Sequence, residues 1–176
     1  RLPDLRPRAH SSRSRIPVAL LLGAGLVAFI GAWNLPHPLH LRLSPYKGLS
    51  QVLNFPDAWI TWQRWNAFSR VDRVSSTAVR SAPGLSLTYP GQMPVQDGLF
   101  VDGDDLSGII RTDSGFTSAD LASFTGYLPV ALPYRLRPGG RVLLFEPRGG
   151  IDLWTALSQG AATVQVVESN PLVIAA

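Results

Sequence analysis

The chain contains no cysteine among its 176 residues, and this absence excludes three kinds of chemistry. Without a thiol, the protein can form no disulfide, bind no metal through a thiolate and use no cysteine nucleophile. Histidine is scarce as well, with only His10, His37 and His40. His37 and His40 are three residues apart, but Pro36 and Pro38 disfavour the helix that would place both on one face. We therefore expect no metal site.

Charge is unevenly distributed along the sequence, although the net value is +4. Residues 1–50 hold seven Arg or Lys and one Asp, a balance of +6. Residues 51–176 hold nine Arg or Lys and eleven Asp or Glu, a balance of −2. Binding to nucleic acid needs a clustered basic face on the folded domain. Because the basic residues lie in the N-terminal segment instead, we expect no nucleic-acid partner.

Residues 16–33 form an apolar run without a charge, with Pro17 near its start and Trp33 at its end. At about 1.5 Å per residue, a helix of this length just crosses a hydrocarbon core of about 30 Å. The alternative is the apolar region of a signal peptide, which is usually shorter and ends at a small-x-small cleavage site. No such site is clear here, so the run predicts a transmembrane helix over residues 16–33 and a membrane protein.

The flanks of this run bear on its orientation in the membrane. Residues 1–15 form a basic tail with five arginines, whereas only Arg42 and Lys47 follow the run closely. The positive-inside rule then places the tail in the cytoplasm and residues 34–176 outside. That orientation conflicts with binding of a cytosolic nucleotide, so the side of the soluble part is left open. Glycines within the run allow close approach of a neighbouring helix, which leaves a homo-oligomer open as well.

Residues 34–112 are interpreted as a linker followed by a β-hairpin module. Aromatic and β-branched residues predict three short strands, at 50–55, 59–64 and 68–75. Asp102-Gly103 is typical of a hairpin turn and is followed by a predicted return strand at 109–110. Three tryptophans on these strands favour packing or an interface over a stacking surface. They are Trp59, Trp62 and Trp65.

From residue 113 onward the pattern becomes that of an α/β domain. Thr117 or Ser118 can cap a helix that has Asp120 in its first turn. A second helical segment is predicted over 127–136, bent by its two prolines. A βαβ unit follows, with a continuous apolar strand of the buried parallel kind, a helix and a second strand. These three elements are predicted at 141–145, 151–159 and 163–167.

The turn between the first strand and the helix of this unit has the pattern of a nucleotide site. Gly149 and Gly150 allow the backbone to approach a ligand, and the helix N-terminus offers free N–H groups and a positive dipole end. Glu168 ends the second strand, where an acid accepts hydrogen bonds from ribose hydroxyls. The alternative is that Glu168 is merely solvated. Asp152 either reaches the ligand or complements the helix dipole, and Glu146 stands near the ligand's polar groups.

The segments that carry these features resemble the spermidine synthase family, which has a class I methyltransferase-like fold. They are residues 142–152 and 166–171. Further segments resemble the β-hairpin domain of the family's membrane-fused bacterial relatives. They are residues 44–47, 64–72 and 99–103. The resemblance covers residues 44–176 and implies an α/β, Rossmann-like domain behind a β-hairpin module and one transmembrane helix.

The resemblance also implies a ligand, a reaction and a location. The ligand would be decarboxylated S-adenosylmethionine or S-adenosylmethionine, and the acceptor a diamine that becomes a longer polyamine. An acidic residue would take the proton from the amine, whose nitrogen then attacks the carbon next to the sulfonium. No metal is required, and the protein would lie in the inner membrane of a bacterium.

Several features depart from the family pattern. Glu146 and Arg148 stand where glycines are expected, so their side chains would crowd the ligand. They could instead close the turn by a local salt bridge, worth about 0–1 kcal/mol if exposed. Phe124 and Gly126 stand where soluble synthases carry the Tyr and Glu of an acceptor motif.

The two ends of the sequence suggest that it is part of a longer protein. It opens on Arg1, and its last residues, 170–176, read as the first turns of a helix. We expect an incompletely covered sheet and a catalytic, aspartate-rich loop that lies beyond Ala176. No residue of this chain is therefore assigned a catalytic role, and residues 34–176 alone are expected to be inactive.

Two functional hypotheses of different classes remain. The first is a spermidine synthase-like membrane protein that binds an adenosyl-sulfonium nucleotide. The second is a non-catalytic, membrane-anchored binding module whose nucleotide site has degenerated. The retained Glu168 and Gly150 favour the first hypothesis, and the substituted glycines favour the second. A dinucleotide-binding domain fits the acid at the strand end, but the sequence lacks Gly-x-Gly-x-x-Gly.

Overall fold

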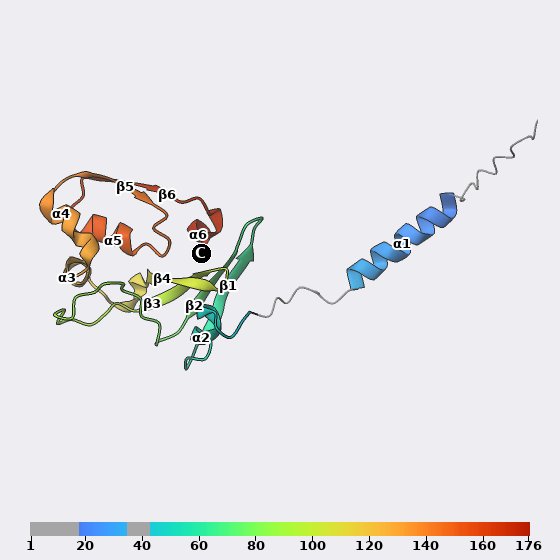
Figure 1. The fold of residues 1–176 in the computed structure, drawn as a ribbon, viewed down its shortest axis with the longest axis horizontal. Coiled ribbons are helices and arrows are strands. Elements are labelled where there is room, and N and C mark those ends of the chain that lie inside the picture. Colours follow the sequence, from blue (N-terminus) through green and yellow to red (C-terminus); the bar gives the residue numbers. More distant parts are fainter. Residues whose placement is uncertain (1–17, 35–42) are drawn as a thin grey trace, which may run out of the picture. The chain divides into compact units, whose positions relative to one another are not determined.

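The computed structural model describes residues 18–34 and 43–176, which belong to two separate units. The basic tail, residues 16–17 and His37 and His40 lie outside the described residues. Residues 43–176 form one compact unit, and it is a mixed α/β structure with a four-stranded antiparallel sheet and a two-stranded parallel sheet (Figure 1).

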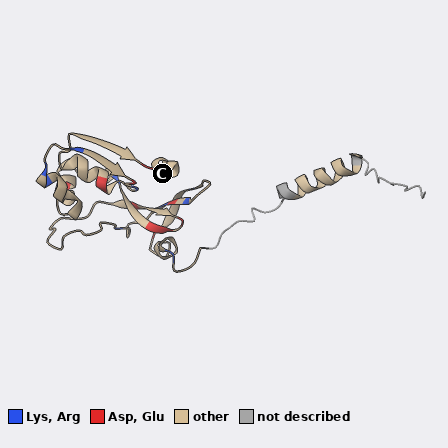
Figure 2. Ribbon diagram, turned by 45° about the horizontal axis from the view of Figure 1, so that its top comes forward, with Lys and Arg blue, Asp and Glu red and all other residues tan. Residues whose placement is uncertain are grey.

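The N-terminal unit contains the helix α1, which spans Val18–Asn34. The predicted helix is thus present, and Figure 2 shows no charged residue on its described part. Its 17 residues rise about 25 Å, somewhat less than a hydrocarbon core of about 30 Å. No helix within residues 18–34 or 43–176 combines the length and the apolar character of a membrane span. The assignment of residues 16–33 as a transmembrane helix is therefore not supported, and membrane localisation stays a prediction.

The antiparallel sheet has the strand order β1-β2-β3-β4 (Figure 1). Its strands are β1 (Trp59–Trp65), β2 (Arg70–Ser75), β3 (Gln96–Val101) and β4 (Asp104–Ile110). The predicted hairpin turn between β3 and β4 is confirmed, because Asp102 and Gly103 have φ values of 54° and 73°. Such positive φ values at both central positions match the right-handed twist of the flanking strands.

The prediction of a strand at residues 50–55 is wrong, because residues 50–52 belong to the helix α2 (Gly48–Val52). Leu49 and Val52 are three residues apart and therefore face the same side of the helix. Both are buried in a cluster that includes Val74 and Phe100 of the antiparallel sheet. Tertiary burial of this helical face overrides the local preference that favoured a strand.

The helix α3 (Ser118–Gly126) begins as the sequence predicts. Thr117 Oγ1 accepts a hydrogen bond from Asp120 N at 3.1 Å, and Asp120 Oδ2 accepts one from Thr117 N at 3.0 Å. This reciprocal capping box satisfies two backbone donors at the start of the helix. A short 3₁₀ helix, η1 (Thr112–Ser114), lies between β4 and α3.

The helical segment predicted over 127–136 is only partly confirmed. It is divided into the 3₁₀ helix η2 (Pro129–Ala131) and the helix α4 (Leu132–Leu136). Leu128 is extended, with φ −87° and ψ 145°. A residue that precedes proline is disfavoured in the helical region, so Pro129 separates α4 from α3.

The predicted βαβ unit is confirmed. It consists of β5 (Arg141–Phe145), α5 (Ile151–Ser158) and β6 (Thr163–Val167), and β5 pairs with β6 in parallel. Gly160, which follows α5, has a φ of 83° and ends the helix in the left-handed conformation that glycine adopts without strain. A last short helix, α6 (Pro171–Ala175), follows β6.

The burial predicted for β5 is wrong, although the strand itself is present. Leu143 is 50% exposed and Phe145 is 71% exposed, whereas Val142 and Leu144 are partly buried. The helix α5 contacts both parallel strands. A parallel sheet is normally covered by helices on both faces, and among residues 43–176 none covers the face with Leu143 and Phe145. The expectation of an incompletely covered sheet is thus confirmed.

Two apolar clusters join the βαβ unit to the antiparallel sheet. In one, Val173 of α6 packs against Val71 and Leu99 on the sheet. In the other, Phe124 of α3 and Ile110 of β4 form a buried group against which α5 packs. Polar contacts also place the turn between β5 and α5 against β4. The end of β6 lies beside the turn between β1 and β2.

Candidate functional site

The turn between β5 and α5 has the backbone of a glycine-rich turn without all of the glycines. Glu146, Arg148 and Gly150 have φ values of 49°, 51° and 88°. A non-glycine residue in this left-handed region carries about 1–3 kcal/mol of strain, which the surrounding structure must offset. The family resemblance predicts glycine at positions 146 and 148. The backbone at both positions has the conformation that glycine favours.

Contacts with β4 hold this turn in place. The Arg148 guanidinium forms an ion pair with Asp105, and Ser107 Oγ accepts a hydrogen bond from Gly149 N at 2.9 Å. The local salt bridge between Glu146 and Arg148, which the sequence left open as an alternative, is therefore not formed. Glu146 lies on the other side, where its Oε1 accepts a hydrogen bond from Ser169 Oγ at 2.7 Å. The turn thus contacts β4 through Arg148 and Gly149, and the end of β6 through Glu146.

Gly149 and Gly150 play different parts in this turn. A Cβ atom on Gly149 would lie 2.5 Å from the carbonyl oxygen of Gly108 and 2.7 Å from its carbonyl carbon. A Cβ atom on Gly150 would meet no atom within 4 Å. Gly149 is thus needed for close packing of the turn on β4, whereas Gly150 faces open space at the N-terminus of α5. Among residues 18–34 and 43–176, no side chain caps that N-terminus.

We expect the substitution Gly149→Ala to lower the free energy of unfolding by about 1–3 kcal/mol, because the added methyl overlaps backbone atoms that cannot rotate away. Gly126→Ala is the matched control, since its Cβ would meet only flexible side-chain ends at 3.5 Å or more. Urea unfolding of both variants provides the measurement. Equal stability of Gly149→Ala and Gly126→Ala would contradict the packing role of Gly149.

Glu168 follows the last residue of β6, where the sequence placed it. Its Oε1 accepts a hydrogen bond from Asn170 N at 3.0 Å. Its Oε2 is buried and has no hydrogen-bond donor among the described residues. A buried acceptor without a donor is costly and rare in folded proteins. One oxygen of this carboxylate therefore accepts no hydrogen bond from the described residues. The other is already used by Asn170 N, so only one oxygen is left for the ribose hydroxyls.

A polar network around Asn170 orients Glu168, and this network was not predicted from the sequence. Asn170 Oδ1 accepts a hydrogen bond from Asn66 Nδ2, and Asn170 Nδ2 donates one to Ser69 Oγ, both at 2.8 Å. Asn170 Oδ1 also accepts from Leu172 N at 3.1 Å, which caps α6. The dipeptide Asn170-Pro171 was a usable signal, because an Asn cap before a first-turn proline is typical of a helix start. The partners in the β1–β2 turn had no such signal.

A small pocket of about 250 Å³ lies between β4 and the turn that joins β5 to α5. Pro147, Ile151 and Asp152 line it from the turn and α5, and Ser107 and Gly108 line it from β4. Neither of the two glutamates, 146 and 168, is among the residues that line this pocket. The structure thus brings Asp152 and the turn together at one pocket and places the two glutamates at the ends of the parallel strands.

Asp152 also acts on a neighbouring side chain. Burial, and then the charge of Asp152, raise the pKa of Tyr134 above its usual value. Asp152 lies in the first turn of α5, where it also complements the helix dipole. Its position is compatible with both interpretations that the sequence left open. Within the described residues, no group of three or more His, Asp or Glu side chains could hold a metal ion.

Phe124 and Gly126, the two positions of the altered acceptor motif, both make contacts within the fold. Phe124 is fully buried, and the ring of Tyr89 meets it edge-on with 5.8 Å between centroids. The carbonyl oxygen of Gly126 accepts a hydrogen bond from the Arg135 guanidinium. Both residues therefore stabilise the packing around α3.

No protein-family model matches the chain, and no curated protein and no solved structure matches it either. The resemblance to the spermidine synthase family rests on the sequence motifs alone and stays a prediction.

Proposed function

We propose that residues 43–176 bind an adenosyl-sulfonium nucleotide, with the Glu168 carboxylate holding its ribose. The observation that carries this proposal is the buried Oε2 of Glu168, which has no donor within the described part of the chain. A ribose hydroxyl is a donor of the right kind, and an acid at this strand end is where such a donor binds in nucleotide-binding α/β folds. Asn170 N already orients the carboxylate through Oε1.

The turn and the helix after it support the same ligand. Gly150 leaves open space at the N-terminus of α5, and the uncapped N–H groups there favour a polar or negatively charged ligand group. The pocket of about 250 Å³ beside Asp152 is below the usual size of a complete ligand site. It would accommodate one part of the nucleotide while Glu168 holds another.

Aminopropyl transfer is the reaction that the family resemblance suggests for the whole protein. In that reaction, the lone pair of a diamine nitrogen attacks the carbon next to the sulfonium and the carbon–sulfur bond breaks. The sulfur leaves as a neutral thioether, and a base takes the proton from the new ammonium. We assign none of these proton-transfer roles to a described residue, so the proposal for this chain is limited to binding the nucleotide.

A second candidate is a binding module whose nucleotide site has degenerated. The observation that favours it is the ion pair between Arg148 and Asp105. Together with the hydrogen bond from Gly149 N to Ser107 Oγ, this pair occupies groups of the turn that a ligand would otherwise contact. In this case the turn serves to attach the βαβ unit to β4, and the protein acts through a binding surface.

The substitution Glu168→Gln separates the two candidates. A hydrogen bond to a charged acceptor contributes about 1.5–3 kcal/mol, so we expect Glu168→Gln to lower the affinity for S-adenosyl ligands by roughly ten- to a hundredfold. Asp104→Asn is the control, because Asp104 is an exposed carboxylate that pairs with Lys47 and does not line the pocket beside Asp152. Its affinity should equal that of the parent chain.

Calorimetric titration of the 176-residue chain with S-adenosylmethionine and its decarboxylated form provides the measurement. A further variant, Arg148→Gly, is expected to bind more tightly, because it removes the side chain from the turn and relieves a strained φ. Measurable and equal affinities of the parent and Glu168→Gln would exclude the ribose role. Absence of binding in the parent, Glu168→Gln and Arg148→Gly alike would favour the degenerate module.

A further inference from the structure

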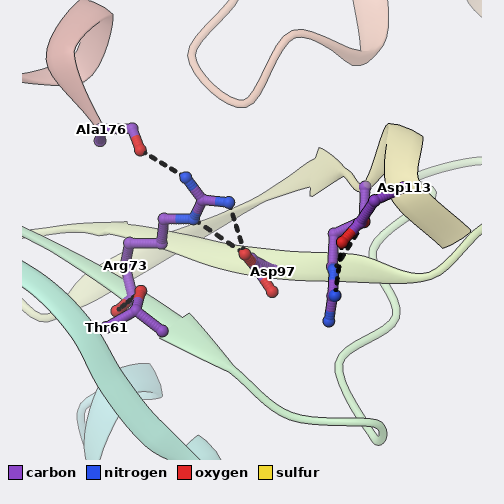
Figure 3. Close-up of polar contacts among 6 residues, drawn as sticks. Thr61, Arg73, Asp97, Asp113 and Ala176 are labelled. Carbon is purple, nitrogen blue, oxygen red and sulfur yellow. Dashed lines mark hydrogen bonds and ion pairs between the residues drawn. The ribbon is translucent and has the colours of Figure 1, made fainter.

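A second pocket lies on one face of the antiparallel sheet and shares no residue with the turn between β5 and α5. Its volume is about 420 Å³, and its lining includes Trp59 of β1, Arg73 of β2 and Asp97 of β3. Arg111 and Asp113, which follow β4, also line it. Figure 3 shows Arg73 and Asp97 reaching toward each other across neighbouring strands, with Asp113 beyond them.

Asp97 is the buried polar group of this pocket. Its side chain is only 6% exposed, and its Oδ2 accepts hydrogen bonds from Arg73 Nε at 2.8 Å and Nη2 at 2.6 Å (Figure 3). Its Oδ1 has no donor among the described residues. Arg73 directs its remaining nitrogen, Nη1, to the carbonyl oxygen of Ala176 at 2.7 Å. Asp97, which lines the pocket, therefore keeps one carboxylate oxygen without a donor from the described residues.

The pocket is also lined by an ion pair that is already complete. Arg111 donates from Nε and Nη2 to the two oxygens of Asp113, at 3.2 Å and 2.9 Å. The hydrogen bond from Arg111 lowers the pKa of Asp113, and the charge of Arg73 lowers it further. Asp113 is therefore ionised at neutral pH. Each arginine of the pocket is committed to a carboxylate, which disfavours an anionic ligand.

The strand register places an aromatic ring on the same face as Asp97. Trp59 pairs with Ser75 across β1 and β2, and Ser75 pairs with Asp97 across β2 and β3. Paired residues point to the same face, about 5 Å apart per strand, so Trp59 stands about 10 Å from Asp97. The Trp59 side chain is largely exposed, at 61%. An exposed indole attracts cations and covers apolar chains.

We propose that this pocket binds a primary ammonium group, which donates to Asp97 Oδ1 while its carbon chain lies along Trp59. An ammonium group has three donors and no acceptor, so it satisfies the unused oxygen without competing for the two arginines. A charge-assisted hydrogen bond of this kind is also stronger than one from a neutral hydroxyl. The site uses residues other than those of the proposed nucleotide site, so the two proposals succeed or fail separately.

The test is a titration of the 176-residue chain with n-butylammonium, followed by NMR at the Trp59 indole and the Ser75 amide. The neutral isostere n-butanol is titrated in parallel. We expect Asp97→Asn to weaken binding roughly ten- to a hundredfold, because it removes the charged acceptor. Trp59→Leu should weaken it about two- to fivefold. Trp65→Leu, which alters an exposed tryptophan of the same strand outside the pocket, should leave it unchanged.

Asp97→Asn also deprives Arg73 of its partner, so its folding is checked first by circular dichroism. If that variant fails to fold, the test is the difference in n-butylammonium affinity between Trp59→Leu and Trp65→Leu. Both positions are exposed, so neither substitution should prevent folding. Equal affinities of the parent and Trp59→Leu, or equal effects of n-butanol and n-butylammonium, would overturn the proposal. Glu168→Gln should bind n-butylammonium as the parent does, whatever its affinity for nucleotide.

Discussion

Replacing Arg70 by alanine should lower the free energy of unfolding by about 3–5 kcal/mol at pH 7, because it leaves a buried carboxylate without its charge partner. Arg70 Nε and Nη2 donate to Asp72 Oδ1 at 3.0 Å and 2.7 Å. Asp72 is fully buried in β2, and its Oδ2 has no donor within the described residues. Arg70 is therefore the main compensation for the burial of this charge.

The loss of stability should depend on pH. Burial raises the pKa of Asp72 above its ordinary value of 3.8, although the hydrogen bond and the charge of Arg70 both oppose that rise. A carboxyl whose pKa is raised by folding favours the folded state below its unfolded pKa, and this contribution is lost as the pH rises through the folded pKa. Removal of Arg70 raises that pKa further. The penalty of Arg70→Ala should thus shrink as the pH is lowered toward 4.

Urea unfolding at pH 7 and near pH 4 measures both effects. Arg111→Ala is the matched control, because the ion pair between Arg111 and Asp113 is exposed and such pairs contribute little. We expect only a small change in that variant at either pH. The prediction fails if Arg70→Ala lowers the free energy of unfolding no more than Arg111→Ala does, or by the same amount at both pH values. Either result would show that the buried Asp72 carboxylate is not stabilised by Arg70.

Replacing Phe124 by alanine is expected to cost about 3–5 kcal/mol of unfolding free energy, because the change leaves a cavity in a packed cluster. Phe124 is fully buried in α3 and packs with Ile110 and Leu128. This cluster connects α3, α5 and β4, so its loss should loosen the βαβ unit from the antiparallel sheet. The S-adenosyl affinity of the variant should fall only in proportion to its unfolded fraction.

Phe145→Ala is the control for this substitution, because Phe145 is exposed on the uncovered face of the parallel sheet. Its expected cost is under about 1 kcal/mol, the range of strand propensities and surface substitutions. Thermal unfolding followed by circular dichroism compares the two variants. If Phe124→Ala were as stable as Phe145→Ala but lost ligand affinity, Phe124 would belong to the binding site rather than to the core.

The sequence alone determined the features that depend on a few neighbouring residues. Positive φ values at Asp102 and Gly103, the capping box at Thr117 and the stop at Gly160 are all local backbone preferences. The βαβ unit was predictable for the same reason, since apolar periodicity and turn residues act within a few positions. Glu168 was placed at a strand end because the two strands of that unit were identified correctly.

The tertiary structure decided which residues meet over long separations in the chain. Arg148 pairs with Asp105, which is 43 residues away, and Asn170 bonds to Asn66, which is 104 residues away. Neither partner could be chosen from the sequence, because many charged or amide side chains satisfied the local pattern equally well. The strand predicted over 50–55 failed for a related reason, since burial against the sheet selected a helix there. Apart from proline, local propensities differ by at most about 1 kcal/mol, whereas burying one large apolar side chain contributes about 1.5–3 kcal/mol. Packing therefore prevails wherever the two disagree.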